Sequence, residues 1–136
     1  MRVFLDTNIL LDVLMDRPGL AGESGDVILK CGAMRAEMFI AWHGLATAYY
    51  LLRRNRTEAE TLGQMDRILE WAQVATAGDT QAREARDLGF PDFEDALQAV
   101  SAQECGADLI VTRNLADFSK STVEAVHPTE FLNRFR

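Results

Sequence analysis

The chain has 136 residues, 48% of them hydrophobic and 26% charged, a composition typical of a globular protein with one hydrophobic core. Its formal net charge of −7 argues against a broadly basic surface for nucleic acid, although clustered carboxylates that hold a divalent metal also make a chain acidic. No apolar run reaches the roughly 20 residues of a membrane span. No leader precedes the first apolar run, so we expect a cytoplasmic protein with a single domain over residues 1–136.

Short apolar runs alternate with stretches of helical periodicity along the chain. The apolar runs predict strands over residues 2–5, 37–41, 73–75, 108–112 and 123–126. The periodic stretches predict helices over residues 7–15, 23–34, 43–54, 57–71, 80–88, 93–105 and from 128 onward. Strands that alternate with helices favour crossover connections and a parallel sheet. The predicted fold is therefore a three-layer α/β/α sandwich around a central parallel sheet of four to five strands.

Local signals mark several helix ends. Thr57 and Glu60 have the spacing of a capping box, which predicts a helix start. Gly89 and Gly106 each follow a periodic stretch, where a glycine cap is expected. Pro128 is the residue type favoured at a first helical position. The two cysteines, at positions 31 and 105, lack metal-ligand spacing and are interpreted as reduced core residues.

Asp6 ends an apolar run abruptly, directly after the predicted first strand. A carboxylate placed there is costly unless a cation or a hydrogen-bond donor meets it. Two interpretations stay open: Asp6 caps the next helix, or it belongs to a site that uses its charge. In a parallel sheet, ligands bind beyond the carboxyl ends of the strands, where the strand order reverses.

Further acids follow the fifth predicted helix and the fourth predicted strand. Asp92, Glu94 and Asp95 crowd the start of one helix, and Asp117 lies shortly after the strand over residues 108–112. Asp92 and Asp95 are three residues apart and share a helix face, whereas Glu94 points roughly 100° away from Asp95. Carboxylates that converge repel one another, and Mg²⁺ or Mn²⁺ relieves that repulsion. Such an ion can activate water for attack on a phosphodiester.

Each acid also has an ordinary structural interpretation. Asp92 has the position of a helix N-cap, and Asp95 lies in the first helical turn, where the helix dipole favours an acid. Asp117 reads as a solvated loop acid when it is taken alone. The joint placement of these acids at strand and helix ends is what favours a site.

Three segments carry a resemblance to a known family: "FLDTNILLDVL", "DFEDALQAVSAQECGADLIVTRNLADF" and "HPTEFL". In these segments the chain resembles the PIN-domain family, which includes VapC-type toxins of toxin–antitoxin pairs. The resemblance covers nearly the whole chain. It implies an endoribonuclease that depends on Mg²⁺ or Mn²⁺, with RNA as substrate, an antitoxin as partner and a homodimer as assembly. No membrane is expected among its partners, because no apolar run is long enough to span one.

The same resemblance implies roles for individual residues. The implied catalytic acids are Asp6, Asp95 and Asp117, and the implied metal ligands are Asp6, Asp95 and Asp92. The implied supporting residues, which orient the acids through hydrogen bonds, are Thr7, Asn8, Thr112 and Asn114. The side chains considered for contact with RNA are Arg113 and His43.

The chain departs from the family pattern at two positions. Thr47 stands where many relatives have glutamate, and Asn114 stands where many have aspartate. Asp117 can compensate for Asn114, one helical turn further on. These departures support an alternative to the nuclease: a non-catalytic PIN scaffold that binds RNA or a protein partner. An aspartyl phosphohydrolase is disfavoured because Asn8 stands where it needs a second aspartate, and a phospho-accepting receiver because no acceptor follows the third strand.

Overall fold

The computed structural model describes all of residues 1–136 and contains five strands, seven α-helices and one 3-10 helix. The elements follow along the chain in the order β1 (Arg2–Leu5), α1 (Thr7–Leu14), α2 (Ala21–Ala33), β2 (Glu37–Ala41), α3 (Trp42–Arg53), α4 (Glu58–Trp71), β3 (Ala72–Ala75), α5 (Asp79–Asp87), α6 (Phe93–Glu104), β4 (Leu109–Val111), η1 (Leu115–Phe118), β5 (Glu124–Val126) and α7 (Pro128–Arg134). All strands lie in one parallel sheet of order β3-β2-β1-β4-β5. The predicted α/β sandwich is confirmed, with five strands.

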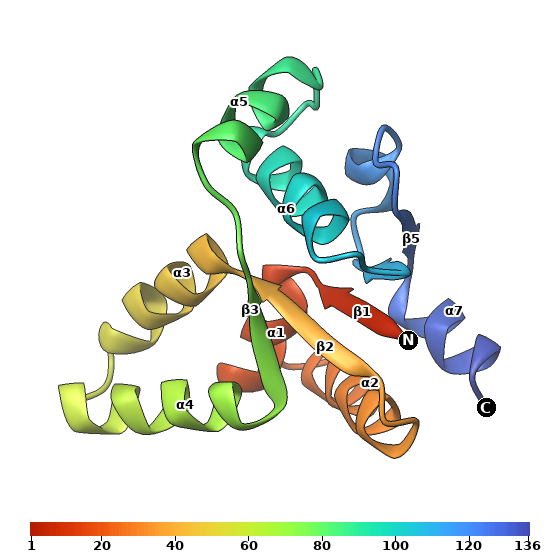
Figure 1. Ribbon diagram of the computed structural model, residues 1–136. Helices are drawn as coiled ribbons and strands as arrows, with labels where there is room; N and C mark the ends of the chain where they lie inside the picture. Colours follow the sequence, from red (N-terminus) through yellow and green to blue (C-terminus); the bar gives the residue numbers. More distant parts are fainter.

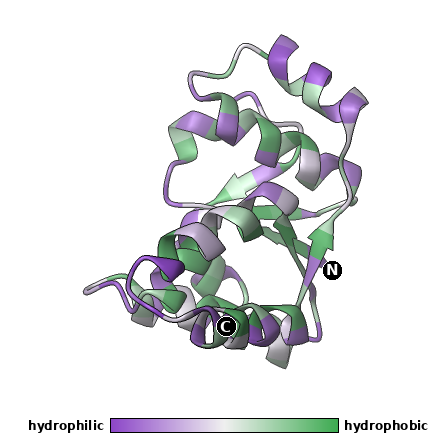
Figure 2. Ribbon diagram, turned by 90° about the vertical axis from the view of Figure 1, so that its left-hand side faces the viewer, coloured by the Kyte–Doolittle hydropathy of each residue, from purple (hydrophilic) through white to green (hydrophobic).

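The hydrophobic core has two layers, one on each face of the sheet, because successive side chains of a buried strand point to opposite faces. In β1, Val3 and Leu5 pack into the larger cluster with side chains from α1, α2, α3, α4 and α7. Phe4 points the other way and packs with α6 and η1. Figure 1 shows α5 and α6 on one side of the sheet and α1 and α2 on the other. The apolar strands run through the middle of the molecule in Figure 2.

The strand order reverses at β1. The chain runs from β1 outward through β2 to β3, then crosses back to add β4 and β5 on the other side of β1. The carboxyl ends of β1 and β4 therefore flank the reversal point, where open parallel sheets bind their ligands. The residues that follow these two strands, Asp6 and Thr112, lie at that point.

The predicted helix caps are confirmed. Thr57 and Glu60 form a reciprocal capping box at the start of α4. Gly89 and Gly106 have positive φ angles of 70° and 69°, a backbone conformation that glycine adopts without strain. Pro128 is the first residue of α7.

Three details differ from the sequence prediction. The second helix begins at Ala21 rather than at Glu23, because no side chain caps its start to mark the boundary. A short 3-10 helix, η1, follows β4 and was not predicted. Both cysteines are free, and Cys31 is buried as expected, but Cys105 is only half-buried because it lies beyond the last turn of α6. No helix combines the length and the apolar character that crossing a membrane requires.

Candidate metal centre

Asp6 and Thr112 meet at the carboxyl ends of β1 and β4. The backbone N–H of Asp6 donates to Val111 O at 3.0 Å, which fixes the end of β1 against β4. Asp6 Oδ1 accepts the backbone N–H of Asn8 at 3.2 Å, and Oδ2 accepts the hydroxyl of Thr112 at 2.7 Å. Asp6 therefore caps α1 and faces the reversal point of the sheet at the same time, so the two interpretations left open by the sequence do not exclude each other.

Gln98 of α6 connects Asp6 to the acids of α6, and sequence analysis did not single it out. Its side chain is fully buried, and Nε2 donates to Asp6 Oδ1 at 2.9 Å and to Glu94 Oε1 at 3.2 Å. Its Oε1 accepts both the backbone N–H and the hydroxyl of Thr7, at 3.0 and 3.3 Å. α3 approaches Thr7 so closely that a Cβ on Gly44 would lie 2.6 Å from the Thr7 hydroxyl oxygen. The amide is therefore held rigidly against Asp6.

The start of α6 gathers three carboxylates. Asp92 caps the helix by accepting the backbone N–H of Asp95 at 3.2 Å. One carboxylate oxygen each from Asp92, Glu94 and Asp95 lies within 4.8 Å of the others. The expectation that Glu94 points away from Asp95 was wrong, because its longer side chain bends toward Gln98 one turn further along the helix.

Asp95 lies at the centre of these acids. It is 7% exposed, and no hydrogen bond is formed by its carboxylate oxygens. Burial, the largest cause, and the negative charges of Glu94, Asp6, Asp92 and Asp117 together raise the pKa of Asp95 to about 7. All four acids are therefore close enough to act on Asp95 electrostatically. Asp95 is largely buried, and its carboxylate oxygens, which reach the surface, form no hydrogen bond within the protein and face like charge. Such a group of hard oxygen donors fits a divalent cation such as Mg²⁺ or Mn²⁺.

Asp117 and Asn114 lie in the segment after β4. Asp117 is on η1, partly buried, and its backbone N–H donates to Asn114 O at 3.0 Å. Asn114 is exposed, and its backbone N–H donates to the Thr112 hydroxyl oxygen at 3.0 Å. Only the backbone of Asn114 contacts Thr112, which in turn donates to Asp6. Asp117 is the residue of this segment whose negative charge acts on Asp95.

The face of α3 near the site carries no acid. Thr47 is exposed, and its hydroxyl donates back to His43 O at 3.0 Å. His43, one turn earlier, reaches α6 instead, and its Nε2 lies 2.7 Å from Glu94 Oε2. The side chain by which α3 contacts α6 here is therefore a histidine, and position 47, where the family resemblance implies a glutamate, adds no charge.

Arg113 points away from the acids of α6 and into a network around Asp12 that the sequence did not reveal. Asp12 is 1% exposed and accepts hydrogen bonds from Arg113, from the Ser24 hydroxyl at 2.7 Å and from Arg17 at 3.4 Å. Arg113 also pairs with Glu23 at 3.4 Å. The signal for this network was an acid on an otherwise apolar face of α1. Its effect is to fix the backbone beside Thr112.

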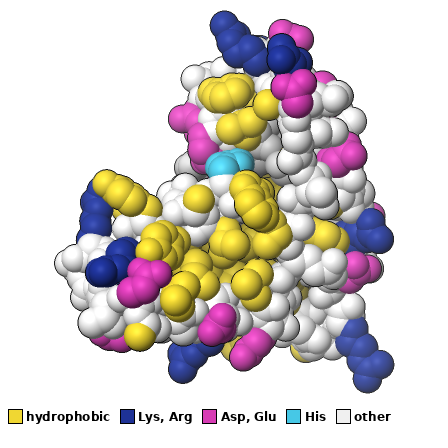
Figure 3. All heavy atoms as spheres, turned by 60° about the vertical axis from the view of Figure 1, so that its left-hand side comes forward, with side chains coloured by type: hydrophobic (Ala, Val, Ile, Leu, Met, Phe, Trp, Pro, Cys, Tyr) yellow, Lys and Arg dark blue, Asp and Glu magenta, His cyan; other side chains and the backbone are white.

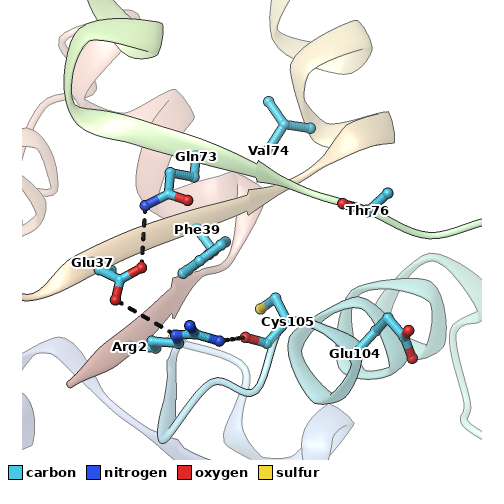
Figure 4. Close-up of a pocket in the computed structure, with 8 residues that line it drawn as sticks. All are labelled: Arg2, Glu37, Phe39, Gln73, Val74, Thr76, Glu104 and Cys105. Atoms are coloured by element: carbon cyan, nitrogen blue, oxygen red, sulfur yellow. Dashed lines mark hydrogen bonds and ion pairs between the residues drawn. The ribbon is translucent and has the colours of Figure 1, made fainter.

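A hollow of about 370 Å³ lies at the opposite end of the sheet from Asp6 (Figure 4). Arg2 at the start of β1 donates to Cys105 O at 2.8 Å and lies 3.6 Å from Glu37, which accepts from Gln73 at 3.3 Å. Arg2 and Glu37 pair with each other there. No group of acids comparable to that around Asp95 lines this hollow, so we do not regard it as a metal centre.

The surface also carries an apolar patch on α3 and α4, visible in Figure 3 as a broad field of hydrophobic side chains. The residues that line it, here called the α3–α4 patch, are Trp42, Leu45, Ala46, Tyr49 and Met65. Trp42 is 71% exposed. A large aromatic side chain that is exposed within an apolar patch is typical of a surface that contacts another protein.

Known proteins resemble this chain in sequence and in fold. A family model described as "PIN domain" matches residues 2–116. Ribonuclease VapC1 of Aquifex aeolicus (strain VF5) is 24% identical over 139 residues, covering 98% of this chain and 95% of that protein.

Two solved structures share the fold. The 2.2 Å structure of VapBC-1 from nontypeable Haemophilus influenzae matches with a TM-score of 0.69 and 17% identity, covering 95% of this chain and 99% of the other. VapBC2 from Rickettsia felis, bound to a DNA fragment from its promoter, matches with a TM-score of 0.68 and 20% identity, covering 93% of this chain and 98% of the other.

Proposed function

The chain belongs to the PIN domain family, and we propose that it is an endoribonuclease that depends on Mg²⁺ or Mn²⁺. One observation carries the proposal: Asp95 is largely buried, its carboxylate forms no hydrogen bond within the protein, and the charges of Asp6, Asp92, Glu94 and Asp117 surround it. The relative named Ribonuclease VapC1 supports the choice of RNA as substrate. The cluster supports the choice of a hard divalent cation.

Asp6 and Asp95 would hold the cation, with Asp92 and Asp117 as further ligands, directly or through water. Asp6 Oδ2 accepts one hydrogen bond, from Thr112, so this oxygen keeps a lone pair for a ligand bond. Such an ion, when bound, supplies an activated water and neutralises charge on the phosphodiester.

The chain's own residues contribute orientation. Gln98 and Thr112 hold the two oxygens of Asp6, and the backbone N–H of Asn114 orients the Thr112 hydroxyl in turn. Oriented outer residues of this kind typically change metal affinity by roughly 10–100-fold when they are replaced.

A cleavage assay on labelled single-stranded RNA, with Mg²⁺, Mn²⁺ or EDTA, tests the proposal. The wild type is expected to cut RNA only with a divalent ion, and Asp6→Asn and Asp95→Asn are expected to be inactive. Asp66→Asn, which removes an exposed acid from α4, is the control and is expected to cut normally. The proposed nuclease activity would be refuted by a wild type that is inert with both metals, or by an Asp6→Asn variant that is as active as the wild type.

The second candidate is a non-catalytic PIN scaffold that binds RNA or a protein. It is favoured by Thr47, whose hydroxyl turns back to His43 O, and by Asn114, which is exposed and uncharged. The scaffold predicts no saturable binding of Mn²⁺, so calorimetric titration with Mn²⁺ separates it from the nuclease.

We further propose that the chain is the toxin of a toxin–antitoxin pair and that the antitoxin covers the α3–α4 patch. The exposed Trp42 and the apolar surroundings support a protein contact there. Light scattering on the chain, alone and co-expressed with a small upstream reading frame, tests this. A 1:1 assembly that Trp42→Ala abolishes supports the antitoxin. A homodimer that leaves no room for the co-expressed protein contradicts it.

Contacts of Arg113 and His43 with RNA remain predictions. Arg113 is paired with Asp12 and Glu23, and His43 contacts Glu94, so both side chains already have partners. RNA binding measured in EDTA on Arg113→Lys and His43→Gln tests whether either side chain contributes.

A further inference from the structure

α3 reaches the cluster through one side chain. Its threonine at position 47 turns back onto the helix, whereas His43 extends across to α6, with Nε2 at 2.7 Å from Glu94 Oε2. An ionised carboxylate only accepts hydrogen bonds, so the His43 Nε2 carries the proton in this contact. His43 is 30% exposed and Glu94 is 48% exposed, so the contact forms at the rim of the cluster.

Glu94 is held from both sides. While Oε2 faces His43, Oε1 accepts from Gln98 Nε2 at 3.2 Å, and the same nitrogen donates to Asp6 Oδ1 at 2.9 Å. This double contact fixes the carboxylate near Asp95 and the helix cap Asp92, and one ligand atom of each of the three acids lies within 4.8 Å of the others. Asp95 belongs to the same group, is only 7% exposed, and its carboxylate oxygens form no hydrogen bond within the protein, so they are free for a ligand.

We propose that Glu94 is a ligand of the divalent cation and takes the place of the acid that α3 lacks, and that His43 is the positioning residue that holds Glu94 there. The inference rests on the proposed metal-dependent function. In this arrangement α6 supplies the carboxylate, and α3 supplies only the group that orients it. The coordinating charge of the site is thereby preserved although position 47 is a threonine.

Calorimetric titration with Mn²⁺ on the purified full chain tests the ligand. Glu94→Gln keeps the shape and removes the charge, and it is expected to weaken Mn²⁺ binding by roughly 10–100-fold. Glu104→Gln is the matched control, because it removes the same charge from the exposed far end of α6, and its affinity is expected to equal that of the wild type. Water-proton relaxation of bound Mn²⁺ gives a second readout, in which Glu94→Gln shows more exchangeable water on the ion.

His43 is tested by a pair of variants. His43→Leu removes the donor and is expected to weaken Mn²⁺ binding by about tenfold, whereas His43→Gln retains a donor and is expected to restore most of the affinity. In a Glu94→Gln background, His43→Leu is expected to have no further effect, because it acts through Glu94. Thermal unfolding in EDTA checks that every variant is folded at the temperature of the titration.

Two results would contradict parts of the proposal. If Glu94→Gln binds Mn²⁺ as tightly as the wild type does, Glu94 is not a ligand of the ion. If His43→Leu weakens Mn²⁺ binding equally in the wild-type and the Glu94→Gln backgrounds, His43 does not act through Glu94. These outcomes leave the metal-dependent function in place. A wild type that shows no saturable Mn²⁺ binding overturns the proposed function and this inference together.

Discussion

Replacement of Asp95 by asparagine is expected to stabilise the folded chain at alkaline pH when no divalent cation is present. Burial and the charges of Glu94, Asp6, Asp92 and Asp117 raise the pKa of Asp95 to about 7 in the folded chain. The ionised form of this side chain is therefore unfavourable in the folded state. Asparagine has nearly the same shape and no charge at any pH, so the variant avoids that cost.

The magnitude follows from linkage. In the unfolded chain an aspartate has a pKa of about 3.9, so between about pH 4 and pH 7 the folded state keeps a proton that the unfolded state has lost. The free energy of unfolding of the wild type therefore falls as the pH rises through this window, by about 1.4 kcal/mol for each pH unit. From pH 5 to pH 7, the titration of Asp95 alone lowers the free energy of unfolding of the wild type by roughly 2–3 kcal/mol. Full stability with respect to this group is present only below pH 4.

Urea unfolding followed by circular dichroism, in EDTA at pH 5 and pH 8, measures the effect. The difference in unfolding free energy between Asp95→Asn and the wild type is expected to grow by roughly 2–3 kcal/mol from the lower to the higher pH. Asp66→Asn is the matched control, since it removes an exposed carboxylate, and its difference from the wild type is expected to stay constant. Added Mn²⁺ is expected to stabilise the wild type and not the Asp95→Asn variant. A pH-independent difference for Asp95→Asn would refute the reasoning.

Three further substitutions test the packing around the site and the ends of the helices. Gly44→Ala places a Cβ 2.6 Å from the buried Thr7 hydroxyl oxygen, so it is expected to lower the free energy of unfolding in urea by roughly 1–3 kcal/mol. Gly63→Ala, which has open space around it, is the control and is expected not to lower it; equal effects of the two variants would contradict the prediction. Thr57→Ala removes the cap of α4 and is expected to cost about 1 kcal/mol, and an unchanged urea midpoint argues against it. Asp12→Ala leaves two arginines without their buried partner and is expected to cost about 3 kcal/mol, which a thermal midpoint equal to that of the wild type would disprove.

The fold could be predicted from the sequence because the signals for strands, for helix ends and for topology agree with one another. The buried strands are short apolar runs, and helix ends are marked by residues such as Thr57, Gly89 and Gly106 that satisfy or accommodate the end of a helix. Parallel strands alternating with helices leave few topologies. The 3-10 helix η1 escaped prediction because a single turn has no periodicity to detect.

The candidate site was predictable only in part. Asp6 and Asp95 stood out because each follows a strand or starts a helix, where the topology gathers ligands. Glu94 was misplaced because helical spacing fixes the direction of a side chain at Cβ and not where a long side chain ends. Gln98 was overlooked, although a glutamine among Ala96, Ala99 and Val100 signals a buried amide, and a buried amide needs hydrogen-bond partners.

The central claim is that carboxylates from both halves of the chain share one divalent cation. Anomalous scattering from crystals grown with Mn²⁺ tests it most directly. We expect a single strong peak at coordination distance, about 2.0–2.3 Å, from carboxylate oxygens of both Asp6 and Asp95. Crystals at saturating Mn²⁺ that show no peak there, or a peak that contacts only one of these two side chains, would contradict the account.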